Sequence, residues 1–266
     1  MLRSDMVSQY LQALDLHKRS PDFDFLTELV RRHVATFAFS SVACRLGEEL
    51  PLDFESLFDR IVKQRRGGYC FEQNGFLYDV LENLGFSPEL YLARVIYNQD
   101  IHPPLTHRIS VVVHDGKRYV LDVGFGPLGP GVPVLISDEE STCGDKVFRV
   151  SERNPGEFHM QVLKDGDFYS LYRFEFSRYG QADCELGHFY SHRHPKASFV
   201  NHLVVSRILS DETRSLRDLE YRIIKTEGDE AIKIVNPQQL RQILVESLGV
   251  QVTESESCTL FAGSSS

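Results

Sequence analysis

A cysteine stands where two glycines allow the chain to turn sharply into a helix. Cys70 lies within RGGYCFEQN, residues 66–74, directly after Gly67, Gly68 and a tyrosine. A thiol in the first turn of a helix feels the positive end of the helix dipole, which favours the nucleophilic thiolate. A lone cysteine on an apolar helix is more often structural. A nucleophilic role for Cys70 therefore requires a base close by in space.

A predicted β-hairpin supplies a base and an acid. Asp115-Gly116 separates two apolar segments, and this dipeptide favours a two-residue turn. With His114 opposite Lys117, the register continues until His107 and Asp122 are diagonal neighbours on one face of the sheet. Their Cβ atoms are then about 7–8 Å apart, so the two side chains can meet.

Cys70, His107 and Asp122 together predict a nucleophile, a base and an acid that orients the base. Taken singly, His107 is better interpreted as a core histidine and Asp122 as a cap at a strand end. The joint placement, with Gly124 opposite His107 leaving room beside the imidazole ring, favours a catalytic role.

The first third of the chain is predicted to be helical. Asp5, Asp24 and Asp53 are candidate N-caps of three helices whose apolar residues recur every three or four positions. A fourth helix follows residues 67–68 and ends at Gly85.

After residue 85 the pattern changes to short segments rich in Val, Ile, Leu and Tyr. Residues 89–97, 106–114, 117–123 and 167–176 predict an antiparallel sheet curled into a barrel or sandwich. The last third predicts strands at 199–206, 219–225 and 230–235, then a helix from Pro237 to about Leu248. The tail, residues 263–266, is expected to be disordered.

The composition is that of a globular protein. The chain has 266 residues, 42% hydrophobic and 25% charged, and a net charge of -9. The acidic balance argues against nucleic acid or an anionic membrane as partner. There is no apolar stretch of about 18 residues and no secretory leader pattern, so we expect a soluble, cytoplasmic protein.

No metal site is expected. The five cysteines include no CxxC pair, and His188, His192 and His194 beside Cys184 match no common zinc spacing. Two basic residues in this stretch, Arg193 and Lys196, could meet phosphates, but a solvated basic patch is the simpler interpretation.

The motif around Cys70 resembles the active-site segment of the arylamine N-acetyltransferases. Thr106-His107 and the segment DVGFG at 122–126 resemble the other two active-site segments of that family. The nine-residue cysteine motif is specific, whereas the other two are informative only in combination. The resemblance covers most of the chain, is clear from about 60 to 130, and is thinner from Phe189 to Phe199.

The resemblance implies an α+β fold in three parts. A helical bundle at 1–85 carries the nucleophile, an antiparallel β-barrel at 86–188 carries His107 and Asp122, and an α/β lid forms 189–266. The Cys-His-Asp arrangement would be that of a cysteine proteinase. These expectations agree with the helices and strands predicted from the residues.

The resemblance also implies a ping-pong reaction with acetyl-coenzyme A as cosubstrate and no metal. Cys70 would take the acetyl group and pass it to an aromatic amine, a hydrazine or an N-hydroxyarylamine. His107 would hold the thiol proton as an imidazolium, and Asp122 would fix the imidazole ring.

Substrate contacts follow from position within the family motifs. Phe125 and Gly126 are expected to border the acceptor pocket, with Val95 and Phe39 further out. Ser198 is a candidate contact to coenzyme A from the lid. Ordinary core packing is the alternative for Val95, Phe39 and Phe125, and a loop or cap role is the alternative for Ser198.

The chain departs from the family pattern at residues 38–42. AFSSV stands there, where the family usually has PFENL, and the glutamate of that segment is expected to pair with the motif arginine. Ser40 cannot supply that charge. Because a buried unpaired arginine is costly, we expect Arg66 to find another carboxylate or to reach water.

Other function classes stay open from the sequence. A related acyltransferase or amide synthase could use another acyl donor on the same residues. Cysteine peptidases and transglutaminase-like enzymes also use Cys-His-Asp, although the papain-type signature CG[SA]C[WY] is absent. A binding module with an idle site is disfavoured by the intact Cys70, His107 and Asp122.

Overall fold

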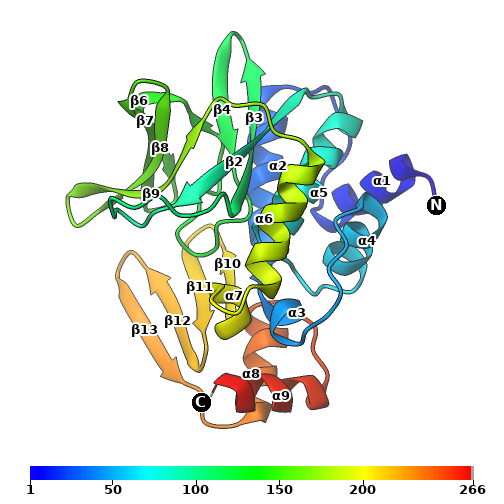
Figure 1. The fold of residues 1–266 in the computed structure, drawn as a ribbon. Coiled ribbons are helices and arrows are strands. Elements are labelled where there is room, and N and C mark those ends of the chain that lie inside the picture. The colour runs from blue at the N-terminus through cyan, green and yellow to red at the C-terminus, as the bar shows by residue number, and fades with distance from the viewer. Residues whose placement is uncertain (265–266) are drawn as a thin grey trace.

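The computed structural model describes residues 1–264 and begins with a helical bundle (Figure 1). Its helices are α1 (Arg3–Ala13), α2 (Phe23–Thr36), α3 (Val42–Arg45), α4 (Phe54–Phe58) and α5 (Cys70–Leu84), with a π-helical turn at Asp59–Lys63 after α4. Apolar side chains from α1, α2, α4 and α5 share one core with Val112 and Leu121 of the sheet that follows. The bundle is thereby fixed to the next part of the chain.

The helix ends follow the capping residues only in part. Asp53 caps α4, accepting a hydrogen bond from the Ser56 backbone N–H at 2.9 Å, and Gly85 ends α5 with φ of 94°. The N-cap of α2 is Asp22, two residues before the expected Asp24. Asp5 is not the N-cap of α1. It lies in the first turn of that helix, where its negative charge interacts favourably with the positive end of the helix dipole.

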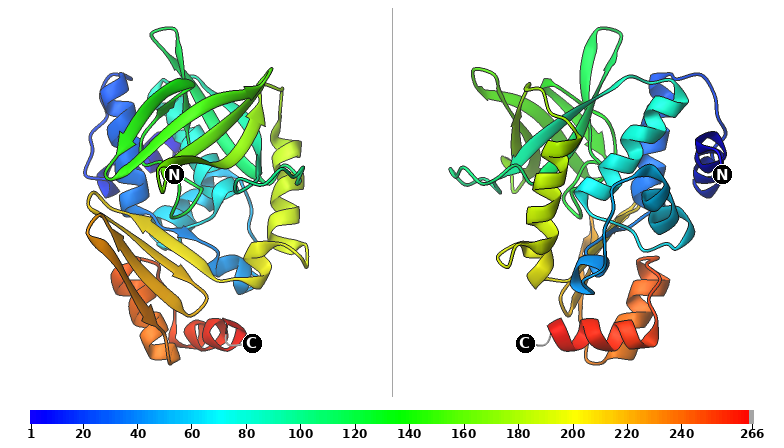
Figure 2. Two further views of the ribbon diagram at one scale, coloured as in Figure 1. Left: turned by 90° about the vertical axis from the view of Figure 1, so that its left-hand side faces the viewer. Right: turned by 45° about the vertical axis from the view of Figure 1, so that its right-hand side comes forward.

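Eight antiparallel strands form a nearly closed barrel. They are β2 (Pro88–Val95), β3 (His107–His114), β4 (Lys117–Leu121), β5 (Val134–Leu135), β6 (Ser137–Cys143), β7 (Lys146–Asn154), β8 (Glu157–Lys164) and β9 (Asp167–Glu175). The spatial order is β5-β4-β3-β2-β9-β8-β7-β6. The two edge strands are consecutive in the chain, which brings the sheet almost to closure (Figure 2).

The last part of the chain is a sheet covered by helices. α6 (Gln181–Arg193) and α7 (Ser198–Asn201) lead into β10 (Val204–Ile208), β11 (Glu212–Arg217), β12 (Glu220–Lys225) and β13 (Gly228–Lys233). α8 (Pro237–Gln242), a π-helical turn at Ile243–Ser247 and α9 (Glu254–Ser264) follow, and their apolar side chains pack under this sheet. Figure 1 shows α6 running along the molecule from the barrel toward the lid.

The three-part α+β fold expected from the sequence is confirmed. The strand expected at 199–206 begins only at Val204, because Ser198–Asn201 forms the short helix α7. Residues 263–264 of the tail expected to be disordered belong to α9, and 265–266 lie outside the described residues. The domain limits stay a prediction, and the one at 188–189 falls within α6.

A two-residue strand from the bundle belongs to the lid sheet. β1 (Phe39–Ser40) pairs with β10 through Phe39 opposite Ser206 and Ser40 opposite Val205. On its other side, the Ser40 backbone N–H donates to the Gly68 carbonyl at 2.9 Å. The chain just before Cys70 is therefore hydrogen-bonded to the lid through β1.

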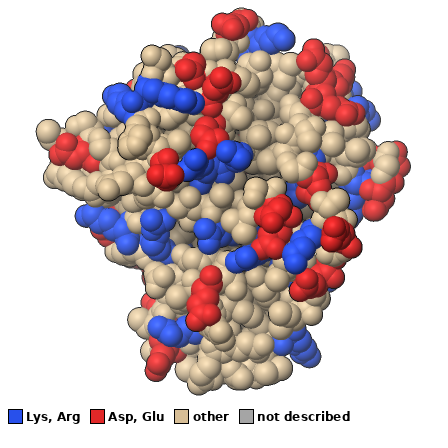
Figure 3. Space-filling model, turned by 180° about the vertical axis from the view of Figure 1, so that it is seen from behind, with Lys and Arg blue, Asp and Glu red and all other residues tan. Residues whose placement is uncertain are grey.

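Positively and negatively charged side chains are interspersed over the face shown in Figure 3.

Within residues 1–264 no helix is both long and apolar enough to cross a bilayer.

Candidate active site

Cys70 is the first residue of α5 and is 3% exposed. The preceding turn depends on Gly67, whose φ is 69° and where a Cβ atom would collide with the Ala38 carbonyl oxygen. The helix start is fixed by Glu72, whose carboxylate accepts the Tyr69 backbone N–H at 3.1 Å. The Cys70 Sγ lies 3.4 Å from the Thr106 carbonyl oxygen, beside the first residue of β3.

His107 and Asp122 meet as the hairpin predicted. The His107 Nε2 lies 2.7 Å from Asp122 Oδ2, and both side chains are buried. The paired register runs from His114 opposite Lys117 to Ser110 opposite Leu121 and stops there. The histidine and the aspartate thus lie just beyond the last paired residues.

The Asp122 carboxylate decides the charge of the buried imidazole. Burial by itself lowers the pKa of His107, but the charge and hydrogen bond of Asp122, with a smaller contribution from the Cys70 thiol, raise that pKa to about 10. Burial likewise tends to raise the pKa of Asp122, and the His107 charge outweighs it and lowers that pKa. His107 is therefore an imidazolium at neutral pH.

Asn74 holds the aspartate in place, a role that the sequence analysis missed. Its Nδ2 donates to Asp122 Oδ1 at 2.9 Å and to the Arg108 carbonyl at 2.7 Å, while its Oδ1 accepts the Val123 backbone N–H at 2.9 Å. The available signal was its spacing, because residues four apart lie on one helix face and Asn74 follows Cys70 by four.

Gly124 allows the barrel to approach the nucleophile closely. A Cβ atom at this position would lie 2.7 Å from the Cys70 Cα and 2.8 Å from the Asn74 Nδ2. Its backbone N–H also donates to Asp122 Oδ1 at 2.9 Å. Only glycine fits here, so the space expected beside the His107 ring is occupied by the start of α5.

Arg66 finds carboxylates elsewhere in the chain, as expected. Its guanidinium pairs with Glu48 and, at 3.0 Å, with Glu256 of α9, and it donates to the Gln251 carbonyl at 2.8 Å. Two acidic residues far apart in the sequence thus replace the charge that Ser40 lacks.

A cavity of about 430 Å³ opens beside Cys70 and His107. Its lining includes Phe39, Val95 and Phe125, all expected at the acceptor pocket, and Ser198. Gly126 is not among the residues that line it, and a Cβ atom at this position would lie 3.6 Å from the Phe39 ring. Gly126 thus contacts Phe39, which lines the cavity, and its expected place at the border of the acceptor pocket stays a prediction.

His188, one of the three histidines near the lid, has both ring nitrogens in hydrogen bonds. Its Nδ1 accepts from the Tyr69 hydroxyl, and its Nε2 donates to the Leu50 carbonyl at 2.8 Å. Burial, with repulsion from His192, lowers the pKa of His188 to about 4. No group of three or more His, Cys, Asp or Glu residues within 1–264 is arranged to hold a metal.

A cysteine at the start of a helix, beside a histidine–aspartate pair on a barrel, is an arrangement that suits enzymes that transfer acyl groups. Residues 22–257 match the N-acetyltransferase family. An arylamine N-acetyltransferase of Escherichia coli is 34% identical over 192 residues, which are 71% of this chain and 68% of that protein. One of Mycolicibacterium smegmatis is 30% identical over 251 residues, or 91% of each chain.

Solved structures agree with these relatives. The arylamine N-acetyltransferase of Salmonella typhimurium superposes with a TM-score of 0.92 at 25% identity, over 97% of this chain and 98% of that one. The Mycobacterium marinum enzyme in complex with CoA gives 0.87 at 25% identity, over 96% and 98% of the two chains. The chain belongs to the arylamine N-acetyltransferase family, as its motifs indicated.

Proposed function

We propose that this acyltransferase moves an acetyl group from acetyl-coenzyme A to an aromatic amine, a hydrazine or an N-hydroxyarylamine. The acetyl group travels as a thioester on Cys70, with His107 as acid and base and Asp122 as the group that orients it. The observation that carries the proposal is the 2.7 Å contact of His107 with Asp122 at the cavity that Cys70 lines.

In the first half-reaction the Cys70 thiolate attacks the acetyl carbonyl carbon. The new carbon–sulfur bond forms as the bond to the sulfur of coenzyme A breaks, and the His107 imidazolium gives its proton to the departing thiolate. The pKa of about 10 at His107 supports this step, since the proton is present at neutral pH.

In the second half-reaction the acceptor nitrogen attacks the thioester carbonyl carbon. Neutral His107 takes the proton from that nitrogen, and the Cys70 sulfur leaves as the thiolate. The aromatic rings of Phe39, Phe125 and Tyr97 in the cavity suit a flat acceptor, because offset and edge-to-face contacts favour aromatic ligands.

Intact-protein mass spectrometry after brief incubation with acetyl-coenzyme A tests the proposal. The wild type and Cys258→Ala, which removes an exposed cysteine, should each gain one acetyl group and lose it when an arylamine is added. Cys70→Ala should gain none, and its turnover should be abolished. Acetylation of Cys70→Ala would remove Cys70 as the nucleophile.

The two alternative functions of Cys70, His107 and Asp122, an acyltransferase with another donor and a peptidase-like enzyme, predict different results. An unacetylated wild type whose Cys70 still reacts rapidly with iodoacetamide would indicate another acyl donor. Hydrolysis of a peptide without coenzyme A would indicate a peptidase-like enzyme.

A cytoplasmic location is also part of the proposal. All five cysteines are free, which suits a reducing compartment. Cell fractionation followed by immunodetection tests this placement.

A further inference from the structure

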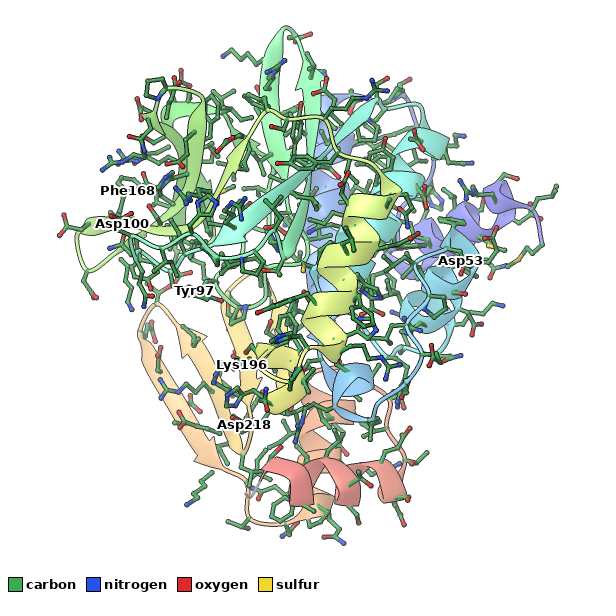
Figure 4. All side chains as sticks on the ribbon, viewed as in Figure 1. Asp53, Tyr97, Asp100, Phe168, Lys196 and Asp218 are labelled. Atoms are coloured by element: carbon green, nitrogen blue, oxygen red, sulfur yellow. The ribbon has the colours of Figure 1, made fainter. Side chains whose placement is uncertain are left out.

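The cavity beside Cys70 has an aromatic end and a cationic end. The rings of Phe39, Phe125 and Phe199 line it near the catalytic residues, whereas Lys196 and Arg217 line it from the lid. No aspartate or glutamate is among the residues of 1–264 that line this cavity. Figure 4 shows Lys196 on the lid side and Tyr97 on the barrel side of the same region.

Neither cation has a counterion in the part of the chain that the structure describes. Lys196 lies between α6 and α7, Arg217 is the last residue of β11, and both are exposed. Neither side chain forms an ion pair or hydrogen bond with another residue of 1–264, in contrast to Arg193, which pairs with Glu49 at 3.1 Å.

The nearest acid in sequence is already engaged. Asp218 accepts hydrogen bonds from His202 at 2.9 Å and from the Leu203 backbone N–H at 3.0 Å. The positive charge of Arg217 acts on Tyr97, on the barrel side of the cavity. Burial raises the pKa of the Tyr97 phenol, and the nearby Arg217 charge partly opposes that rise. Both cations are therefore free to attract an anion that enters the cavity.

We propose that Lys196 and Arg217 form an anion subsite that recognises the oxyanion of a ligand whose reacting end lies at Cys70. This inference rests on the proposed acetyl transfer. Two sources share the required chemistry: the carboxylate of an aminobenzoate-type acceptor, and a phosphate of coenzyme A. A cavity of about 430 Å³ is in the range that holds one small aromatic ligand.

The acceptor arm of the test uses a donor without phosphate. The enzyme is acetylated by p-nitrophenyl acetate, and the thioester is then discharged by 4-aminobenzoate or by its neutral analogue 4-aminobenzamide. If the acceptor carboxylate is the ligand, Lys196→Met and Arg217→Met should each lower the kcat/KM ratio of acid to amide about two- to fivefold, the range for an exposed ion pair. Salt should weaken the wild-type preference for the acid.

The donor arm compares acylation of Cys70 by acetyl-coenzyme A and by p-nitrophenyl acetate. If a phosphate is the ligand, the same two substitutions should lower kcat/KM for acetyl-coenzyme A by a similar factor. Acylation by p-nitrophenyl acetate should then be unchanged.

Lys117→Met is the matched control, because it removes an exposed lysine that does not line the cavity, at the turn between β3 and β4. The anion subsite is overturned if the double variant Lys196→Met/Arg217→Met behaves like Lys117→Met in both arms. A wild type that forms no acetyl thioester from either donor would instead refute the proposed function itself.

Discussion

Of two buried histidines in this molecule, one is charged and the other neutral at neutral pH. His107, between bundle and barrel, has Asp122 at 2.7 Å and a pKa raised to about 10. His33, inside the bundle, lies 2.9 Å from the Tyr10 hydroxyl and 2.9 Å from the Gln73 amide oxygen, and burial lowers its pKa to about 4.

The difference between the two sites shows that the hydrogen-bond partner of a buried histidine, and not its burial, sets the charge of the imidazole ring. Both side chains are withdrawn from water to a similar extent, so the desolvation cost opposes the charged form in each. Only the carboxylate at His107 outweighs this cost. His33 is neutral, with Nε2–H donating to Gln73 and Nδ1 accepting from Tyr10, and its network is structural.

The largest expected effect comes from removing the charge of Asp122. Asp122→Asn keeps the shape of the side chain, but it should lower the pKa of His107 and cost about 10³–10⁴-fold in kcat. A pH–rate profile and the rate of Cys70 alkylation by iodoacetamide measure both consequences. An unchanged profile would contradict the orienting role of Asp122.

A smaller effect is expected from Gln73→Glu, which gives His33 the kind of partner that His107 has. The carboxylate should raise the pKa of His33 by about 1–3 units. The lost hydrogen bond from Gln73 Nε2 to the Ala38 carbonyl, now 2.7 Å, should also reduce stability. NMR titration of the His33 ring gives the pKa, and a value still near 4 would mean that burial dominates.

The smallest expected effect is on the pH dependence of stability. His33 binds a proton at about 4 when folded and at 6.5 in a reference state, so its neutral burial becomes unfavourable as pH falls through that interval. The folded state should lose about 3 kcal/mol between pH 6.5 and pH 4 from this group.

His33→Leu removes this titration and supplies the control. The variant should lose about 1–3 kcal/mol at pH 7, because Tyr10 and Gln73 lose a buried partner. Its stability should then fall less steeply below pH 6.5 than that of the wild type. Urea unfolding at several pH values measures both quantities, and parallel curves would exclude His33 as the source.

The meeting of His107 with Asp122 could be predicted from the sequence because local signals specify the hairpin that carries them. The Asp115-Gly116 turn set the register of the paired residues, and the chain just beyond the last pair places His107 beside Asp122. The glycines at 67–68 and 85 marked the ends of the fourth helix in the same way.

The roles of Asn74 and of the partners of Arg66 could not be predicted, because they depend on contacts between segments that are distant in the sequence. Asn74 has its role because Gly124 lets the barrel come within contact of α5. The partners of Arg66, Glu48 and Glu256, are brought together only when α9 docks. α6 was not predicted because the residues on its buried face, although at helical spacing, are mostly small or polar: Cys184, Gly187, His188 and Ser191.

The two-residue strand β1 has a consequence for how acceptors are chosen. It is hydrogen-bonded to β10 on one side and to the Gly68 carbonyl on the other, so the lid sheet and the turn before Cys70 are one hydrogen-bonded unit. These hydrogen bonds favour a lid that acts as a fixed wall over one that opens as a hinged flap. Substrate range in this enzyme should therefore be altered by exchanging the side chains that face the cavity, and engineering of loop mobility should have little effect on it.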